Sequence, residues 1–537
     1  MGSDVAAARP GTVARLPWWA ALACAAAGGL LLDTASPVLA WWWAALPGAA
    51  LIIAGVWQQR WRTGLAVGAV AGAAFWGPHI SWLTLYLGPI PWLALCAVMT
   101  LWFALFGLAA AVTTRGLAHL AAEAPRARRA LPFVQALAVA GLWAVREGVQ
   151  GAWPYGGFPW GRLVHTQSDG PLQEAVSWLG FSGFSGLLAL ACALPIAVAG
   201  ALRPRRRLIV GAVASSAALV LLLALIPPAP LERAGTLRIA AIQGNSKSGI
   251  FDDRESGSVI DDHIAATSQL LDRLEAEGEA VDLIVWPENS AEFDLPGSPL
   301  NGYRVARLAE RAGAPVVVGS VLPNDDGSYT NSSLVWGEAG EMPGRYDKRY
   351  PVPFAEYMPN RDFFHALVPD LVDLVQLEYT AGTRPAAYDI DTTGGAVRAG
   401  IAICFDIIFD SQAVAMMGDG AELILAQTNN ADFGRTDESA QQLAIARLRA
   451  IETGRSLVNI STVGTSAVVA PDGSDLDRLV PHTAGAMVAE VPRTLGETPA
   501  LRFGATIAAG WMVIGGLGLA LGAVGALRAR RAARNGD

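Results

Sequence analysis

Long apolar stretches at both ends of the chain constrain its fold more than any other feature. Seven precede Pro227 and one follows Ala505, and together they cover residues 17–33, 38–57, 63–84, 90–114, 130–150, 175–201, 207–226 and 505–527. Most reach the roughly 20 residues that a helix needs to cross the hydrocarbon core of a bilayer. The chain is 16% charged, whereas soluble domains average about 25%. The sequence therefore predicts a polytopic α-helical membrane bundle of eight spans.

The first apolar stretch has a second interpretation. Asp33 and Pro37 cut it short, and Ala21-Leu22-Ala23-Cys24 is faintly similar to the cleavage box of a lipoprotein signal peptide. The apolar run before Cys24 is short for a signal peptide. We therefore favour a span, and the signal peptide remains the alternative.

Arginines gather between alternate apolar stretches, and the other connections carry almost no Lys or Arg apart from Arg162. Because basic loops stay in the cytoplasm, eight spans predict that both termini are cytoplasmic. The predicted parts are a membrane domain (1–227), an extracytoplasmic domain (228–504), and span 8 with a cytoplasmic basic tail (505–537). The arginine-bearing segments hold Arg9 and Arg15; Arg60 and Arg62; Arg115, Arg126, Arg128 and Arg129; Arg203, Arg205, Arg206 and Arg207; and Arg528, Arg530, Arg531 and Arg534.

The region between the apolar stretches alternates short β-branched runs with helical patterns. Ile260, Ile264 and Leu271 mark one helical face, and a second, over residues 443–451, ends at Gly454 as a C-cap. Such alternation predicts a sheet covered by helices. The expected strands are Leu237–Gln243, Leu283–Trp286, Val316–Val321, Ser333–Trp336, Ala399–Cys404, Leu423–Gln427, Leu457–Ser461 and Ser466–Ala470.

Three side chains at strand ends carry the candidate chemistry. Cys404 is the only cysteine outside the apolar stretches, Glu288 follows a strand that Pro287 ends, and Lys348 lies between them in the chain. A thiol needs a base or a nearby cation to become a nucleophile. Glu288 is suited to accept its proton, and Lys348 to stabilise an oxyanion. The alternatives are an inert buried cysteine and two solvated surface charges.

Three motifs extend this interpretation. Val-Trp-Pro-Glu-Asn, Tyr-Asp-Lys-Arg-Tyr-Pro-Val-Pro-Phe-Ala-Glu-Tyr-Met-Pro and Ile-Ala-Ile-Cys-Phe-Asp resemble the Glu, Lys and Cys motifs of the nitrilase (carbon-nitrogen hydrolase) superfamily. The second string is similar to that of its membrane-bound apolipoprotein N-acyltransferase family. Similar motifs stand at 156–160, 241–245 and 445–452. The resemblance covers nearly the whole chain and implies an α-β-β-α sandwich inserted in the membrane bundle.

The resemblance implies a role for four residues. Glu288 is similar to the family's general base, Lys348 to its oxyanion-stabilising lysine and Cys404 to its acyl-accepting nucleophile. Glu356 is similar to the additional glutamate that supports the site. The chain departs from the family pattern at Phe405 with Asp406, where Tyr-Glu is common, and at Asp432, where Trp is common; these departures bear on the pocket and the rate.

The implied reaction moves an acyl chain from a phospholipid, through a Cys404 thioester, to the α-amine of the diacylglyceryl-cysteine of an apolipoprotein. The implied location is the bacterial plasma membrane. We expect no cofactor, no metal and no nucleic-acid partner. One alternative is a membrane-tethered amidase or nitrilase acting on a small soluble amide. Another is an idle domain that anchors a partner such as a polyprenol-phosphate mannosyl synthase.

The segment Asp362–Leu377 is apolar with few charges. It lies between the Lys348 and Cys404 motifs, so it is placed to border the same pocket. An exposed apolar face is costly in water and favourable at a bilayer interface. We expect an arm that dips into the outer leaflet and guides acyl chains toward Cys404; the alternative is a core helix broken at Pro369.

Overall fold

The structure is a computed structural model that describes residues 15–122, 127–201, 205–249 and 252–535. Arg9, Arg126 and Arg203, which contribute to the predicted charge asymmetry, lie outside these residues. The helices of residues 18–224, together with the last helix of the chain, form what we call the helical region. Its helices are α1 (Trp18–Thr34), α2 (Ala45–Val56), α3 (Trp61–His79), α4 (Thr84–Leu87), α5 (Pro89–Ala122), α6 (Ala127–Gln150), α7 (Val176–Ala199), α8 (Arg206–Ala224) and α15 (Pro499–Asn535).

A helix forms over each of the eight apolar stretches. Four helical segments within the described residues are long and apolar enough to cross a membrane: Pro89–Ala122, Gln173–Ala199, Arg206–Ala224 and Pro499–Arg534. Trp18–Thr34 and Trp42–Val56 are apolar but shorter. Helix α5 continues past its predicted end, so Arg115 lies within the helix rather than in the following loop.

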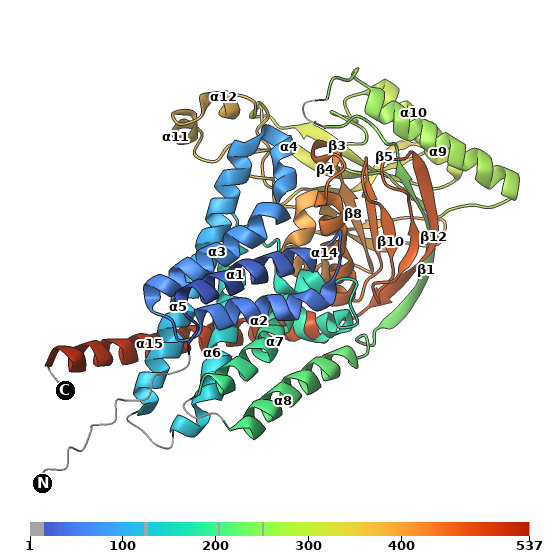
Figure 1. Cartoon of the computed structure of the whole chain (residues 1–537). Helices are drawn as coiled ribbons and strands as arrows, with labels where there is room; N and C mark the ends of the chain where they lie inside the picture. Colours follow the sequence, from blue (N-terminus) through green and yellow to red (C-terminus); the bar gives the residue numbers. More distant parts are fainter. Residues whose placement is uncertain (1–14, 123–126, 202–204, 250–251, 536–537) are drawn as a thin grey trace, which may run out of the picture.

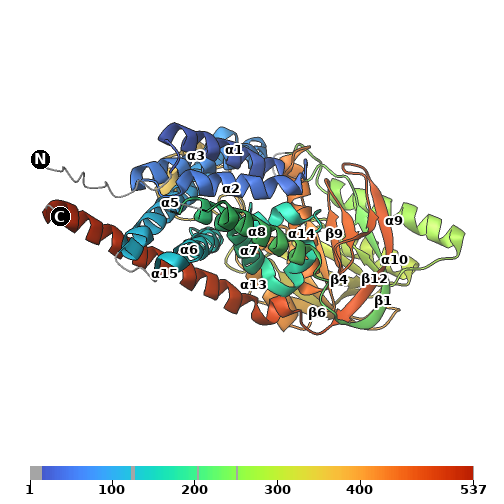
Figure 2. The same cartoon turned by 60° about the horizontal axis from the view of Figure 1, so that its bottom comes forward.

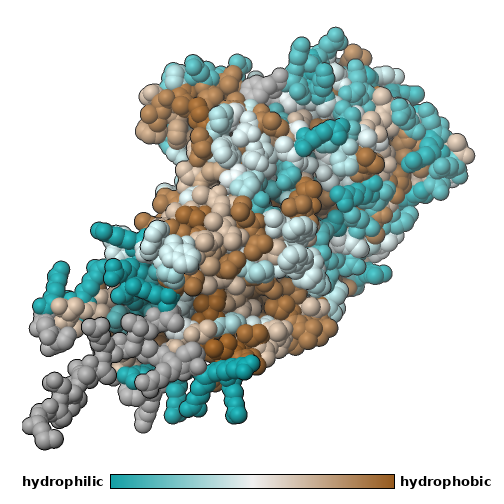
Figure 3. Space-filling view, viewed as in Figure 1, coloured by the Kyte–Doolittle hydropathy of each residue, from teal (hydrophilic) through white to brown (hydrophobic). Residues whose placement is uncertain are grey.

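Small residues let these helices approach each other closely. A Cβ added to Gly116 of α5 would lie 1.7 Å from the carbonyl oxygen of Gly522 in α15, and one on Gly68 of α3 would lie 2.1 Å from that of Phe103 in α5. Backbones can come this close only where one residue lacks a side chain, as is common between membrane helices. Figure 3 shows hydrophobic residues gathered over the helical region, between the hydrophilic sandwich domain and hydrophilic residues near the two termini.

Two six-stranded sheets form within the described residues between α8 and α15, with strand orders β12-β1-β2-β3-β4-β5 and β11-β10-β9-β8-β7-β6. Three neighbouring strands in each sheet, β1–β3 and β7–β9, run parallel, and the other pairs are antiparallel. The strands of the first sheet are β1 (Glu232–Gln243), β2 (Leu283–Val285), β3 (Val316–Pro323), β4 (Tyr329–Gly337), β5 (Gly340–Asp347) and β12 (Gly485–Leu495). Those of the second are β6 (Ala387–Ile390), β7 (Val397–Ile403), β8 (Leu423–Thr428), β9 (Leu457–Ser461), β10 (Ala467–Val469) and β11 (Asp475–Arg478).

The two sheets pack face to face between two layers of helices. Helices α9 (Ser258–Glu277) and α10 (Pro299–Ala312) contact the first sheet, and α13 (Asp410–Gly418) and α14 (Glu438–Thr453) contact the second. This is the α-β-β-α sandwich that the resemblance implies. Figures 1 and 2 show the sandwich and the helical region end to end, with α15 running from the sandwich along the helical region. Helix α14 contacts α7 and α15, so it joins the two parts.

The apolar segment 362–377 forms two short helices instead of a core helix. They are α11 (Arg361–His365) and α12 (Pro369–Val372), and Pro369 is the first residue of α12. Phe363 is 61% exposed and Leu367 63% exposed. Phe364 packs on Phe354 and Tyr155, so the segment contacts the loop that follows α6. Figure 1 shows α11 and α12 standing away from the sheets, near α4.

Candidate active site

Three of the four predicted site residues form one buried ionic cluster. Lys348 Nζ lies 3.1 Å from Glu288 Oε1 and 2.9 Å from Glu356 Oε1. Glu288 follows β2 closely, and Lys348 directly follows β5, which runs in the same direction as β2 and β3. Because the carboxyl ends of strands running in one direction meet at one edge of a sheet, this topology brings the two side chains together. The side chains of Lys348 and Glu288 are 2% and 4% exposed.

Asn331 of β4 completes the cluster. Its side-chain amide donates to Glu288 Oε1 at 2.7 Å and to Glu356 Oε1 at 3.3 Å. The other oxygen of Glu356 accepts from the Val352 backbone N–H at 2.7 Å. These bonds fix both carboxylates against the single ammonium. Sequence reasoning missed Asn331, because a polar residue inside a strand carries no signal by itself.

Cys404 is the first residue after β7, in a 3₁₀ turn that spans Cys404–Ile408. Its φ of 50° lies in the left-handed region, which costs free energy for a residue with a side chain. Asp406 anchors the turn: its carboxylate accepts from the Ile403 and Tyr350 backbone N–H groups at 3.1 and 2.9 Å and from the Tyr346 hydroxyl at 2.7 Å. Asp406 is fully buried, so this departure from the family pattern supports the turn.

A second set of polar residues reaches Cys404 from α14. The Gln442 side-chain amide donates to Cys404 Sγ at 3.5 Å. Asn430 donates to Gln442 Oε1 at 3.0 Å and to Glu438 Oε2 at 2.8 Å. Glu438 is therefore a buried carboxyl group connected to the thiol through two side-chain amides. Sequence reasoning missed Glu438 and Gln442, since both precede the apolar face (443–451) and the motif (445–452) by which helix α14 was predicted.

The charges of the cluster set the protonation of the site. Burial raises the pKa of Glu288, and Lys348 opposes the rise. Burial alone would lower the pKa of Lys348, but Glu288 and Glu356 outweigh it and hold that pKa well above its ordinary value. Burial and the nearby Glu288 charge raise the pKa of Cys404 well above that of a free thiol, against the effect of Lys348. The raised pKa of Glu288 makes its ionised form a stronger base, and the raised pKa of Cys404 favours the neutral thiol.

The helical region contributes aromatic side chains beside the site. Phe158 stacks on Phe405, the residue after Cys404, with ring centroids 6.2 Å apart. Trp82 lies edge-on to Phe433 at 4.9 Å. Trp82 and Trp160 both donate to Gln441 Oε1 of α14, at 3.2 and 2.7 Å. The helical region thus supplies some of the side chains that surround the Cys404 turn.

A thiol, a carboxylate base and a buried ammonium together suit nucleophilic attack on a carbonyl followed by stabilisation of the oxyanion. Among the described residues, no group of three or more His, Cys, Asp or Glu side chains is arranged to hold a metal ion.

The comparisons with known proteins bear on the family of this chain. Residues 238–500 match the family model of carbon-nitrogen hydrolases, which defines the class of the sandwich. Residues 28–194 match the model of the apolipoprotein N-acyltransferase N-terminal domain. The chain therefore belongs to the apolipoprotein N-acyltransferase family, a conclusion that two curated relatives support.

An apolipoprotein N-acyltransferase of Mycolicibacterium smegmatis is 31% identical over 499 residues, which are 86% of this chain and 77% of the relative. One of Azotobacter vinelandii is 31% identical over 395 residues, 71% of this chain and 72% of the relative. Among solved structures, an amidase from Nesterenkonia sp. aligns with 52% of this chain and 98% of its own at 19% identity, with a TM-score of 0.36.

Proposed function

We propose that this protein transfers an acyl chain from a phospholipid to the α-amine of the N-terminal diacylglyceryl-cysteine of bacterial apolipoproteins, through a thioester on Cys404. The observation that carries the proposal is the buried Glu288–Lys348–Glu356 cluster electrostatically coupled to Cys404, in a chain whose family is that of apolipoprotein N-acyltransferases.

The first half-reaction forms the thioester. Glu288 accepts the thiol proton as Cys404 Sγ attacks an ester carbonyl carbon of the phospholipid. Lys348 stabilises the oxyanion, which collapses and expels the alkoxide of the lysophospholipid. Glu288 returns its proton to that leaving oxygen, so the step is balanced. Glu356 shares Lys348 with Glu288 and accepts from the Val352 N–H, which holds the ammonium in place.

The second half-reaction uses the same groups. The neutral α-amine of the diacylglyceryl-cysteine attacks the thioester carbonyl, Glu288 takes a proton from the attacking nitrogen, and the thiolate of Cys404 leaves and is reprotonated. The product is an amide at the lipoprotein N-terminus. A covalent intermediate divides one difficult transfer into two easier ones.

We also propose the membrane arrangement. The helical region crosses the plasma membrane as eight spans within residues 1–227 and 505–537, with the basic tail after span 8 in the cytoplasm, and residues 228–504 face the extracytoplasmic side. The hydrophobic surface of the helical region supports this placement (Figure 3), as do the exposed arginines near the N-terminal ends of α6 and α8 and the C-terminal end of α15.

The polyprenol-phosphate mannosyl synthase remains a predicted partner, which co-purification would test.

A transfer assay with two donors separates this proposal from a tethered amidase. Purified full-length protein is mixed with phosphatidylethanolamine vesicles and a diacylglyceryl-cysteine peptide, or with a small soluble amide. We expect lysophospholipid and N-acylated peptide in equal amounts, and no hydrolysis of the amide. Amide hydrolysis without consumption of phospholipid would support the amidase instead.

A further inference from the structure

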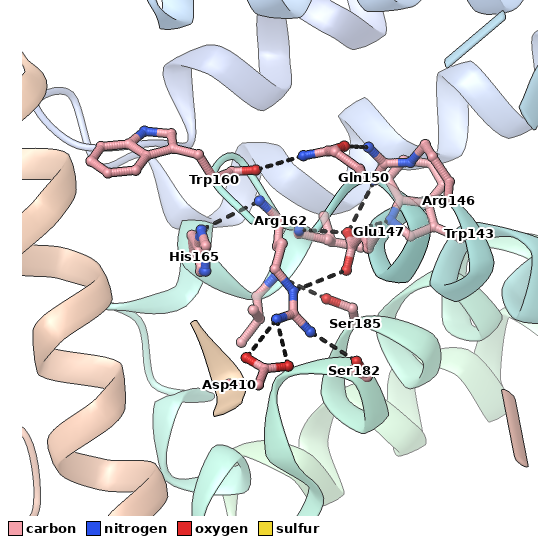
Figure 4. A network of polar contacts seen from close by, with 12 residues as sticks. Trp143, Arg146, Glu147, Gln150, Trp160, Arg162, His165, Ser182, Ser185 and Asp410 are labelled. Carbon is pink, nitrogen blue, oxygen red and sulfur yellow. Dashed lines mark hydrogen bonds and ion pairs between the residues drawn. The ribbon is translucent and has the colours of Figure 1, made fainter. Parts of the chain in front are cut away.

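Charged residues of alternating sign run from the helical region into the sandwich. Glu147 of α6 lies 3.7 Å from the guanidinium of Arg162, which lies 2.9 Å from Asp410 at the start of α13. Asp410 in turn lies 2.6 Å from Arg449 of α14, and Arg449 also pairs with Glu452 one turn further along that helix. Figure 4 shows the Glu147, Arg162 and Asp410 part of this network.

Arg162, like Glu147, belongs to the helical region, and it contacts Asp410 of the sandwich directly. It precedes the short helix at Leu163–Gln167, and the Leu163 N–H donates to Glu147 Oε1 at 2.9 Å. Its guanidinium makes two bonds to the Asp410 carboxylate, at 2.9 and 3.0 Å, and one to the Ser182 hydroxyl at 2.8 Å. These three hydrogen bonds hold the Arg162 guanidinium in one orientation toward Asp410 (Figure 4).

Arg449 connects this network to the turn that carries Cys404. It donates to the carbonyl oxygens of Ile407 and Ile408 at 3.1 and 2.9 Å, and these residues end the Cys404–Ile408 turn. Cys404 itself has a positive φ, a conformation that persists only where surrounding contacts impose it. The position of the nucleophile therefore depends on the position of the Arg449 guanidinium.

The two arginines are buried and share one aromatic ring. Arg162 and Arg449 are 4% and 0% exposed, and both guanidiniums lie over Phe181 of α7, at 5.3 and 3.9 Å from its centroid. Two buried cations this close repel each other unless an anion lies between them. Asp410 Oδ1 accepts from both arginines, although the side chain is 51% exposed.

We propose that Asp410 is a positioning residue for the acyl transfer: by bridging Arg162 of the helical region and Arg449 of the sandwich, it fixes the Cys404 turn. The inference rests on the proposed function, because it assigns Cys404 as the nucleophile. The helical region then has a second role besides embedding the protein in lipid, which is to hold the nucleophile in its reactive position.

Loss of the bridge is expected to affect the chemical step and not the binding of lipid. In Asp410→Asn, the amide oxygen can still accept a hydrogen bond, but the negative charge is lost and an NH2 group replaces one of the two oxygens that contact Arg162. The side chain then no longer offsets the repulsion between the two arginines. Arg449 then shifts, and the turn shifts with it. A displacement of about 1 Å at a reacting atom can slow a reaction about a hundredfold.

The test measures thioester formation in a single turnover, with full-length protein and vesicles of phosphatidylethanolamine. We expect Asp410→Asn to acylate about tenfold to a hundredfold more slowly, at an unchanged half-saturating lipid concentration. Asp410→Glu should recover most of the rate, because it keeps the charge and both oxygens. Asp389→Asn is the matched control: it removes an exposed partner of Arg398, 2.9 Å away, and should leave the rate unchanged.

Thermal unfolding of each variant separates positioning from folding. If Asp410→Asn does not fold, Arg162→Lys keeps the buried charge but loses the two separate nitrogens that bind Asp410 and Ser182, and should slow acylation severalfold in a folded protein. A folded Asp410→Asn protein that acylates at the wild-type rate would overturn the inference. Wild-type protein that forms no thioester would contradict the proposed function itself, which is a distinguishable result.

Discussion

Glu288 shares a single buried cation with a second carboxylate. Lys348 contacts both Glu288 and Glu356, so two negative charges have only one positive charge between them. Burial and the Glu356 charge therefore leave the pKa of Glu288 above its ordinary value in spite of Lys348. A base with a raised pKa takes a thiol proton more readily, which is what an otherwise neutral Cys404 requires.

Substitution of Glu288 tests its role as the base that accepts the thiol proton of Cys404. Glu288→Gln should slow thioester formation by about a hundredfold to ten-thousandfold, because no base remains for the thiol proton. In the wild type, the acylation rate should fall as pH decreases through the raised pKa of Glu288, since protonated Glu288 cannot act as a base. Single-turnover acylation measured across pH reports both effects. An unchanged rate in Glu288→Gln would show that another group is the base.

Glu438 should affect the alkaline side of the same profile. Burial raises its pKa to about 8, against the donated bond from Asn430, so it is mostly neutral at pH 7. When pH rises above 8, Glu438 ionises, and its charge further raises the pKa of Cys404. The acylation rate should therefore decrease through about pH 8 in the wild type. Glu438→Gln should lack this component, whereas Glu490→Gln, at an exposed carboxylate on β12, should retain it. A persistent pH 8 component in Glu438→Gln would assign it to another group.

The candidate reacting residues could be predicted from the sequence more readily than the side chains that contact them. Glu288, Lys348 and Cys404 could be identified because each follows a strand and stands in a motif, and the structure brings them together. Asn331 and Gln442 could not, because their importance lies in side-chain geometry across separate elements. Asp410 gave no signal either, since an Asp at the start of a helix is ordinary capping chemistry.

At the scale of elements, the helices α11 and α12 expose apolar side chains. Val372 and Val375 are buried with Met358 in a small core that Phe354, Phe364 and Val368 also contact. Phe363 and Leu367 remain outside that core. Figure 3 shows hydrophobic residues over this segment. An exposed apolar face next to the helical region is suited to contact with lipid.

Serine substitutions on this face test the arm. Phe363→Ser with Phe364→Ser removes both rings, but Phe364 packs on Phe354, so Phe363→Ser with Leu367→Ser isolates the exposed face. The second pair should slow acylation from phospholipid vesicles at least about tenfold, because burying one large apolar side chain contributes about 1.5–3 kcal/mol and a factor of ten is about 1.4 kcal/mol. It should spare a small soluble thioester donor. Leu300→Ser, at a residue 71% exposed on α10, is the control. Equal slowing with both donors would contradict a lipid-contacting arm.

All eight predicted strands occur in the structure, but β5, β6, β11 and β12 were missed. Strands β5 (Gly340–Asp347) and β11 (Asp475–Arg478) read Gly-Glu-Met-Pro-Gly-Arg-Tyr-Asp and Asp-Leu-Asp-Arg, which show no apolar alternation. The formation of such a strand depends on pairing with its neighbouring strands and on the turn that precedes it, rather than on its own apolar pattern. Helix α10 was missed as well, although Val305, Leu308 and Ala309 form a buried apolar face of the kind that predicts a helix.

At the scale of the whole molecule, the exposed arginines and the sandwich lie at opposite ends of the helical region (Figures 1 and 3). If arginines mark the cytoplasmic face, the sandwich faces outward. The order of eight helices could be predicted because lipid-facing helices need long apolar runs. Their exact ends could not, because α5 and α15 continue as helices beyond the apolar residues.

Cysteine labelling tests this orientation in intact cells with a permeabilised outer membrane, in a Cys404→Ala background. Asp472→Cys, in the turn between β10 and β11, should react with a membrane-impermeant thiol reagent. Arg128→Cys and Arg531→Cys should react only after the inner membrane is opened, because they lie at the basic ends of α6 and α15. Labelling of Arg128→Cys from outside would contradict the eight-span arrangement.

Intact-protein mass spectrometry after mixing with phospholipid tests the central claim most directly. Wild-type protein incubated with phosphatidylethanolamine vesicles, without an acceptor peptide, should gain the mass of one acyl chain, located on Cys404 by peptide mapping. Hydroxylamine should remove this mass, since it cleaves thioesters, and Cys404→Ala should never gain it. An acyl adduct that persists in folded Cys404→Ala, or an active wild-type protein that never carries one, would contradict acyl transfer through Cys404.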